Sequence, residues 1–143
     1  MGAVVTVHGD ASRFTQEIVA GTHRLLADEP RAAGGDDAGP SPYELLLAAL
    51  GGCIAMTLRI YARQKGWPLE DVRVVLTHDK VHAKDCEDCE HEEGMLDVIR
   101  RKVEITGPLS PEQMARLQEI AKRCPVHRTL TGTIEVIADA SLR

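Results

Sequence analysis

Residues 41–65 constrain the fold more than any other part of the chain. They open with SPYE, in which Ser41 is an N-cap, a proline fills the first helical position and Glu44 fills the third, and this arrangement predicts a capped helix start. Residues 45–50 are apolar on every face of that helix, which is typical of a helix buried on all sides. We therefore predict a long, buried central helix that runs to about Lys65 and ends at Gly66.

Short segments rich in valine, isoleucine and threonine lie on both sides of this helix and predict strands. The predicted strands are residues 4–7, 14–20, 23–27, 72–83, 95–105 and 133–138. The first three form an N-terminal β-meander, and the next two form a long hairpin. Charges alternate along the second strand of that hairpin, so one of its faces is expected to be wet.

A second helix begins at SPEQ, residues 110–113, which repeats the capping pattern, and it is predicted to end at Cys124. The glycine-rich and proline-rich residues 30–40 are predicted to form a mobile loop that could serve as a lid. The fold class is therefore α+β. A length of 143 residues fits one domain, which we predict to span residues 1–143.

Composition excludes two classes of partner. A formal net charge of −5, with basic and acidic residues interspersed, argues against nucleic-acid binding. The start of the chain shows no targeting pattern, and the longest uncharged run, residues 45–58, is shorter than the ~20 residues of a membrane span. We expect a cytoplasmic protein, in which four cysteines are more typical of chemistry than of structural disulfides.

Cys53 follows two glycines in the middle of the central helix, where each glycine costs up to ~1 kcal/mol relative to alanine. Glycine side by side with cysteine lets a substrate or another backbone approach the sulfur. The alternative is that Gly51 and Gly52 only permit tight packing and that Cys53 is a small buried apolar residue. The residues alone leave both interpretations open.

Cys124 lies in RCPVHR, residues 123–128, where positive charge would lower the pKa of a thiol. The carboxyl end of the second helix would act in the opposite direction, because its dipole disfavours a thiolate. These opposing effects fit a resolving cysteine better than the first nucleophile. His127 and Arg128 are candidates for binding an anionic substrate group, or else they cap the helix end with exposed charges.

Cys86 and Cys89 form a CxxC pair, with His78 and His82 upstream on one face of a predicted strand. This spacing occurs in zinc knuckles, but only one such pair is present and acidic neighbours would raise the pKa of the thiols. We therefore predict an exposed loop and no metal, with zinc at this pair as the alternative.

The run GPSPYELLLAALGGC, ending at Cys53, and the run CPVHRTL, beginning at Cys124, resemble the OsmC/Ohr family of osmotically inducible and organic hydroperoxide resistance proteins. The order of the predicted elements is similar over most of the chain. The resemblance implies an OsmC-like fold and an intertwined homodimer with its active sites at the interface. It also implies a thiol peroxidase for organic hydroperoxides in oxidative stress defence.

Carried over by position, the resemblance makes Cys53 the peroxidatic cysteine and Cys124 the resolving cysteine. It implies no bound cofactor and an external thiol or a lipoyl-bearing protein as the reductant. The family's catalytic glutamate falls at Tyr43, one position before Glu44, so Glu44 either serves the site or only caps the helix. Tyr43 then becomes a candidate for substrate binding.

The family's arginine would come from the N-terminal strands, where Arg13 is our candidate and Arg24 the alternative. The competing function is a non-catalytic module that binds a small ligand or senses redox state through the same cysteines.

Overall fold

The computed structural model describes residues 2–82 and 94–142, and it confirms the α+β class. Its elements are β1 (Val5–His8), β2 (Gln16–Ala20), β3 (His23–Ala27), η1 (Arg31–Ala33), α1 (Pro42–Lys65), β4 (Asp71–His82), β5 (Met95–Thr106), α2 (Pro111–Ile120), η3 (Ala121–Arg123) and α3 (Pro125–Thr131). The chain divides into two compact units, Met1–Ala48 and Ala49–Arg143, and each is described by itself.

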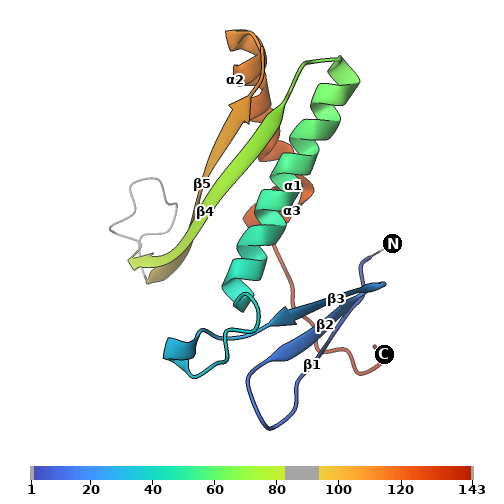
Figure 1. Ribbon diagram of the computed structural model, residues 1–143, viewed down its shortest axis with the longest axis vertical. Helices are drawn as coiled ribbons and strands as arrows, with labels where there is room; N and C mark the ends of the chain where they lie inside the picture. The colour runs from blue at the N-terminus through green and yellow to red at the C-terminus, as the bar shows by residue number, and fades with distance from the viewer. Residues whose placement is uncertain (1, 83–93, 143) are drawn as a thin grey trace. The chain divides into compact units, whose positions relative to one another are not determined.

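The N-terminal unit contains the predicted meander. β2 lies between β1 and β3 and pairs antiparallel with both, so that Ile18 is opposite Val7 on one side and Leu25 on the other (Figure 1). Both outer strands are short and mostly exposed. Within the described residues, β1 and β3 therefore each leave one edge of this sheet without a strand partner.

The stretch predicted to be a mobile loop is cross-linked by one buried carboxylate. Asp28 accepts a hydrogen bond from Thr15 Oγ1 at 2.8 Å, and it also accepts from the backbone amides of Glu29, Asp36 and Ala38 at 2.8, 3.3 and 3.2 Å. Its side chain thereby satisfies amide groups that no strand or helix would pair. The sequence analysis missed this role for Asp28.

The pKa of Asp28 should make the stability of this unit depend on pH. Burial alone would raise that pKa, but the hydrogen bonds from Thr15 and from the Ala38, Glu29 and Asp36 amides more than offset burial and lower it. A carboxyl group with a lowered folded-state pKa stabilises the fold above its unfolded-state pKa. That contribution is lost as the pH falls through the folded-state pKa.

We expect Asp28→Asn to destabilise the protein at pH 7 and to flatten the fall in stability below a pH of about 4. Urea unfolding between pH 2 and about 7 measures both effects. Asp36→Asn is the matched control, because the Asp36 side chain is exposed. Equal pH profiles for wild type and Asp28→Asn would contradict the role of this carboxylate.

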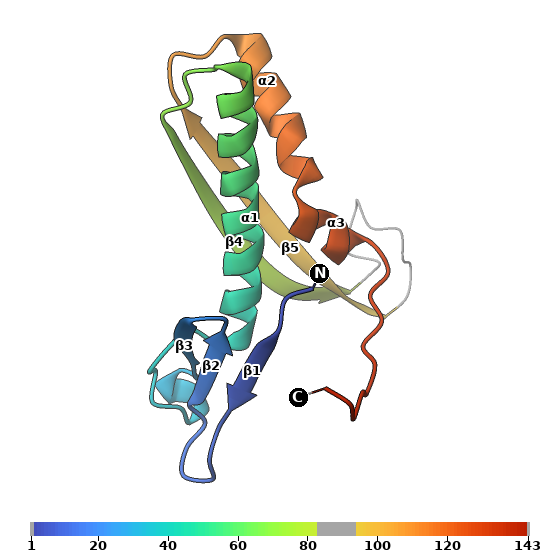
Figure 2. The same cartoon turned by 90° about the vertical axis from the view of Figure 1, so that its right-hand side faces the viewer.

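In the C-terminal unit, β4 and β5 form the predicted hairpin, in which Leu76 is opposite Arg101 and Val74 is opposite Val103 (Figure 1). α1 and α2 lie on one face of the hairpin, and α2 leads through η3 to α3 (Figure 2). The packed core consists of aliphatic residues from these elements together with one cysteine: Leu50, Ile54, Leu58, Ala62, Leu69, Val103, Leu117, Ile120, Ala121 and Cys124.

Gly51 sets how closely α1 approaches the hairpin. A Cβ atom at this position would lie 2.7 Å from Cδ1 of Leu76, which is closer than such atoms normally come. A Cβ at Gly52 would meet nothing within 4 Å. Tight packing therefore explains the first glycine of the pair, whereas the second lies on an open part of the helix.

α1 has the predicted bounds and ends at Gly66, whose φ of 68° suits glycine. The prediction that it is buried on all sides is wrong for the single chain, because Met56 and Ile60 are 69% and 57% exposed. The hairpin and α2 cover only one side of the helix. By length and composition alone, α1 would also pass as a membrane-spanning helix, a test that core helices of soluble proteins pass as well.

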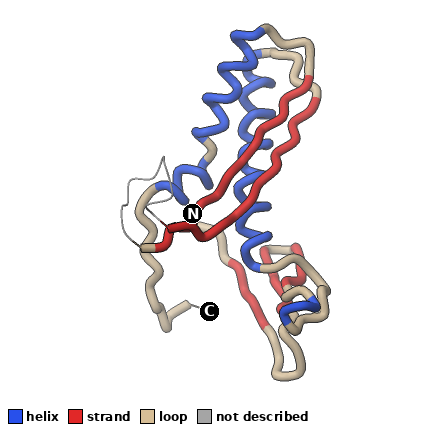
Figure 3. The backbone as a smooth tube through the Cα atoms, turned by 90° about the vertical axis from the view of Figure 1, so that its left-hand side faces the viewer, coloured by secondary structure: helices blue, strands red, loops and turns tan. Residues whose placement is uncertain are grey.

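The last part of the chain corrects two predictions. The second helix does not continue to Cys124: α2, with the predicted capping box at Ser110 and Gln113, ends at Ile120, and Cys124 is the N-cap of α3. Residues 133–138 form no strand and follow an irregular path (Figure 3). Their composition suits a strand, but no other described segment pairs with them, and a strand requires a partner.

Candidate active site

The two cysteines predicted to be reactive lie together in the C-terminal unit. Cys53 projects from α1 and is partly exposed, whereas Cys124 is fully buried in the core. Both are free thiols, and they are close enough for each to influence the ionisation of the other. The structure therefore brings together two residues that are seventy-one positions apart in the sequence.

Cys124 is held at the start of α3. Its sulfur accepts a hydrogen bond from the backbone amide of His127 at 3.2 Å, as an N-cap side chain does. Burial raises the pKa of Cys124, and the Cys53 thiol raises it further, although the His127 and Val126 amides act in the opposite direction. The earlier dipole argument was wrong in sign, because the sulfur caps the amino end of one helix and does not follow the carboxyl end of another.

His127 stands on the first turn of α3 beside the hairpin. Its pKa is lowered, first by burial and then by the positive charges of Arg101 and Lys122. The imidazole is therefore neutral at pH 7. The structure places His127 next to the thiols, as predicted, whereas Arg128 is exposed.

A cavity of about 210 Å³ opens between α1, β5 and α3. Leu50, Ile99 and Leu130 form its apolar wall, and its polar lining consists of Asp97, Arg101, His127 and Thr131. The sequence analysis did not identify Arg101 as a site residue. The signal was present, because Arg101 occupies an inward position of the alternating strand, in line with Ile99 and Val103.

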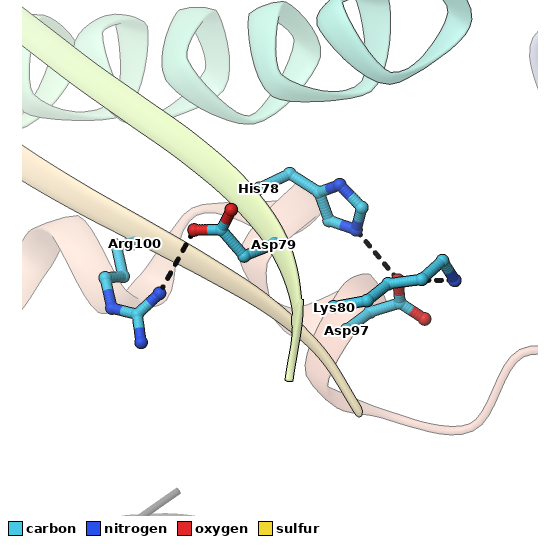
Figure 4. Close-up of polar contacts among 5 residues, drawn as sticks. All are labelled: His78, Asp79, Lys80, Asp97 and Arg100. Carbon is cyan, nitrogen blue, oxygen red and sulfur yellow. Dashed lines mark hydrogen bonds and ion pairs between the residues drawn. The ribbon is translucent and has the colours of Figure 1, made fainter. Parts of the chain in front are cut away.

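Asp97, the other charged residue of the cavity, is already paired. Its carboxylate lies 2.8 Å from Nε2 of His78 and 3.0 Å from Nζ of Lys80, whose side chains converge on it (Figure 4). These contacts lower the pKa of Asp97, with the His78 hydrogen bond as the largest cause. On the strand's other face, Arg100 pairs with Asp79 at 3.4 Å.

The remaining predicted site residues belong to the N-terminal unit. Glu44 accepts a hydrogen bond from the Ser41 amide at 3.0 Å, and its own amide donates to Ser41 Oγ at 3.4 Å, so the capping alternative describes its contacts in the described chain. Hydrogen bonds from Ser41 lower the pKa of Glu44. Tyr43, one residue earlier on α1, is 49% exposed.

The two candidate arginines of this unit have different surroundings. Arg13 is exposed and lines an open hollow with Phe14 and Gln16. Arg24 forms an ion pair with Glu17 across the β2–β3 ladder. Arg24 therefore already has a counter-ion, whereas no printed ion pair engages Arg13.

No group of three or more histidine, cysteine or acidic side chains that could hold a metal ion occurs among residues 2–82 and 94–142. Cys86 and Cys89, to which the zinc alternative was assigned, lie outside the described residues.

Comparison with known proteins gives a family and a fold. The family model described as OsmC-like protein matches residues 34–139, which include both cysteines of the site. No curated protein matches the chain.

Several solved structures share the fold. An OsmC-like protein from Mycoplasma pneumoniae has a TM-score of 0.72 at 20% identity, and the match covers 92% of this chain and 89% of that one. The organic hydroperoxide resistance protein OhrB of Bacillus subtilis has a TM-score of 0.62 at 19% identity, with 92% of each chain covered. A putative organic hydroperoxide resistance protein from Vibrio cholerae, with captopril bound in one active site, has a TM-score of 0.65 at 19% identity, with 94% and 88% covered.

Proposed function

Because this chain belongs to the OsmC-like family, we propose that it is a thiol-dependent peroxidase that reduces organic hydroperoxides in oxidative stress defence. The observation that supports this function best is the pair of free thiols, one partly exposed and one buried beside it. A two-cysteine peroxidase needs this difference, because the first thiol must meet the peroxide and the second must wait within reach.

The proposed cycle begins with the Cys53 thiolate. It attacks the O–O bond, becomes a sulfenic acid and releases an alkoxide, which takes up a proton to leave as the alcohol. Cys124 then attacks the sulfenic sulfur, and water leaves as the disulfide forms. The raised pKa of Cys124 keeps it protonated until then, so its own proton can leave with the hydroxide.

Two electrons must then return to the disulfide. We propose that an external thiol or a lipoyl-bearing protein supplies them by thiol–disulfide exchange, with no bound cofactor. A cytoplasmic location would suit this cycle, because that compartment keeps thiols reduced. The relatives named for organic hydroperoxide resistance are consistent with the substrate class.

We also propose that the working form is a homodimer. The uncovered side of α1 carries Gly52, Met56 and Ile60, spaced so that they share one face of the helix with Cys53. Apolar residues of β1 and of the segment after α3 are exposed as well: Val5, Val7, Ile134, Val136 and Ile137. A second copy would cover such surface, which monomeric proteins rarely leave open.

The proposed function is tested by peroxide consumption with dithiothreitol as the reductant. Wild type should consume cumene hydroperoxide faster than hydrogen peroxide, because the lining is largely aliphatic. The double variant Cys53→Ser/Cys124→Ser supplies the background rate. Equal rates for wild type and the double variant would reject the enzyme and favour a module that only binds a ligand or senses redox state.

A further inference from the structure

The cavity holds one charge that the two-cysteine chemistry does not use. Arg101 is partly buried on the inner face of β5, and it forms no hydrogen bond or ion pair with any residue that the structure describes. Its neighbour Arg100 points to the other face, is exposed and pairs with Asp79. Of these two adjacent arginines, the one that lacks a counter-ion is therefore the one turned toward the cavity.

A guanidinium withdrawn from water is stable when an anion pairs with it, and its planar fork suits a carboxylate. The other groups around the cavity do not supply that anion. His127 is neutral at pH 7, since its pKa is lowered by burial and by Arg101 and Lys122, and Lys122 is itself a cation. Asp97 is four residues away on the strand, about 13 Å, and already has two partners.

The rest of the cavity suits an apolar group. Leu50, Ile99 and Leu130 line it between the charged ends. Its volume of about 210 Å³ lies below the ~300 to 1,000 Å³ of sites for drug-sized molecules, so the ligand must be compact. α3 carries His127 and Thr131 into the lining and begins at Cys124, which places the cavity beside the buried thiol.

We propose that Arg101 binds the carboxylate of a small organic acid whose apolar body lies against Leu50, Ile99 and Leu130. The use of this site in turnover rests on the proposed peroxidase function, whereas binding itself does not. In that cycle two molecules could carry the carboxylate: the hydroperoxide or the reducing thiol. Both present the same chemistry to Arg101.

Binding is tested without turnover. 4-Isopropylbenzoate and its neutral amide are titrated into wild type, Arg101→Gln and Arg100→Gln, with calorimetry as the readout. The acid should bind wild type better than the amide, and Arg101→Gln should weaken acid binding about 10-fold to 100-fold. Arg100→Gln is the matched control and should bind as wild type does.

Equal affinities for acid and amide in wild type, or equal acid affinity in wild type and Arg101→Gln, would overturn the proposal. If Arg101→Gln does not fold, Arg101→Lys replaces it. That variant keeps the charge but loses the fork, so it should still weaken acid binding, and unchanged binding would again count against the site.

Turnover then separates the two sources of the carboxylate. The KM values are compared for cumene hydroperoxide and its para-carboxylate, and for 3-mercaptopropanol and 3-mercaptopropionate. Arg101→Gln should raise the KM of one carboxylated compound about 10-fold more than that of its neutral partner. The pair affected identifies the ligand as substrate or as reductant, and no difference in either pair would reject a role in turnover. Absence of all peroxidase activity would reject the proposed function and leave the binding result standing.

Discussion

Replacement of Cys53 by serine should reduce the consumption of cumene hydroperoxide to the background rate, a loss of about 1,000-fold or more. The serine hydroxyl has nearly the same size as the thiol but does not ionise near neutral pH, so it cannot attack the O–O bond. Cys53 is the more exposed of the paired thiols, and the peroxide must reach the first nucleophile. Peroxide consumption with dithiothreitol measures the loss.

Cys124→Ser is the matched control, because it removes the partner thiol and keeps the proposed nucleophile. Without reductant, this variant should consume about one equivalent of peroxide and accumulate a sulfenic acid on Cys53, whereas wild type should form a Cys53–Cys124 disulfide. Dimedone labelling and mass spectrometry distinguish these products. A sulfenic acid on Cys124 in the Cys53→Ser variant would reverse the two roles.

Met56→Asp should convert a dimer into a monomer. Met56 is 69% exposed in the single chain and lies on the same side of α1 as Gly52 and Ile60. If a second copy covers this side, the new carboxylate is buried without a partner, and the dissociation constant should rise about 100-fold or more. Sedimentation over a range of protein concentrations measures that constant.

Val75→Asp controls for the introduction of a charge, because Val75 is also apolar and exposed but lies on the outer face of the hairpin. It should leave the association unchanged. A monomeric wild type, or a Met56→Asp variant that associates as wild type does, would be evidence against an interface on this side of α1.

Local chemistry explains why much of the fold was predictable. The capping residues at both helix starts, the glycine after Lys65 and the alternation along β5 act within a few residues, so the sequence displays them directly. The outcome for residues 133–138 depends on a partner strand, and no local pattern supplies one. The same holds for the uncovered side of α1, whose apolar residues predicted burial that the single chain does not provide.

The candidate site was predictable only in part. Cys53, Cys124 and His127 were identified because they lie in distinctive motifs. The start of α3 at Pro125 was misread as the end of a helix, although proline also favours the first helical position. Arg101 was missed because its lack of a counter-ion depends on what the hairpin, α1 and α3 bring near it, which is a property of the fold.

The packing of Trp67 has a consequence for how unfolding can be observed. This single tryptophan packs edge-on against Tyr61, with ring centroids 5.5 Å apart, and contacts the core of the C-terminal unit. The N-terminal unit contributes only Phe14 and Tyr43 as aromatic residues. Indole fluorescence therefore reports on one unit, whereas circular dichroism reports on the strands and helices of both. Coincidence of the two signals during denaturation would show that the units unfold together.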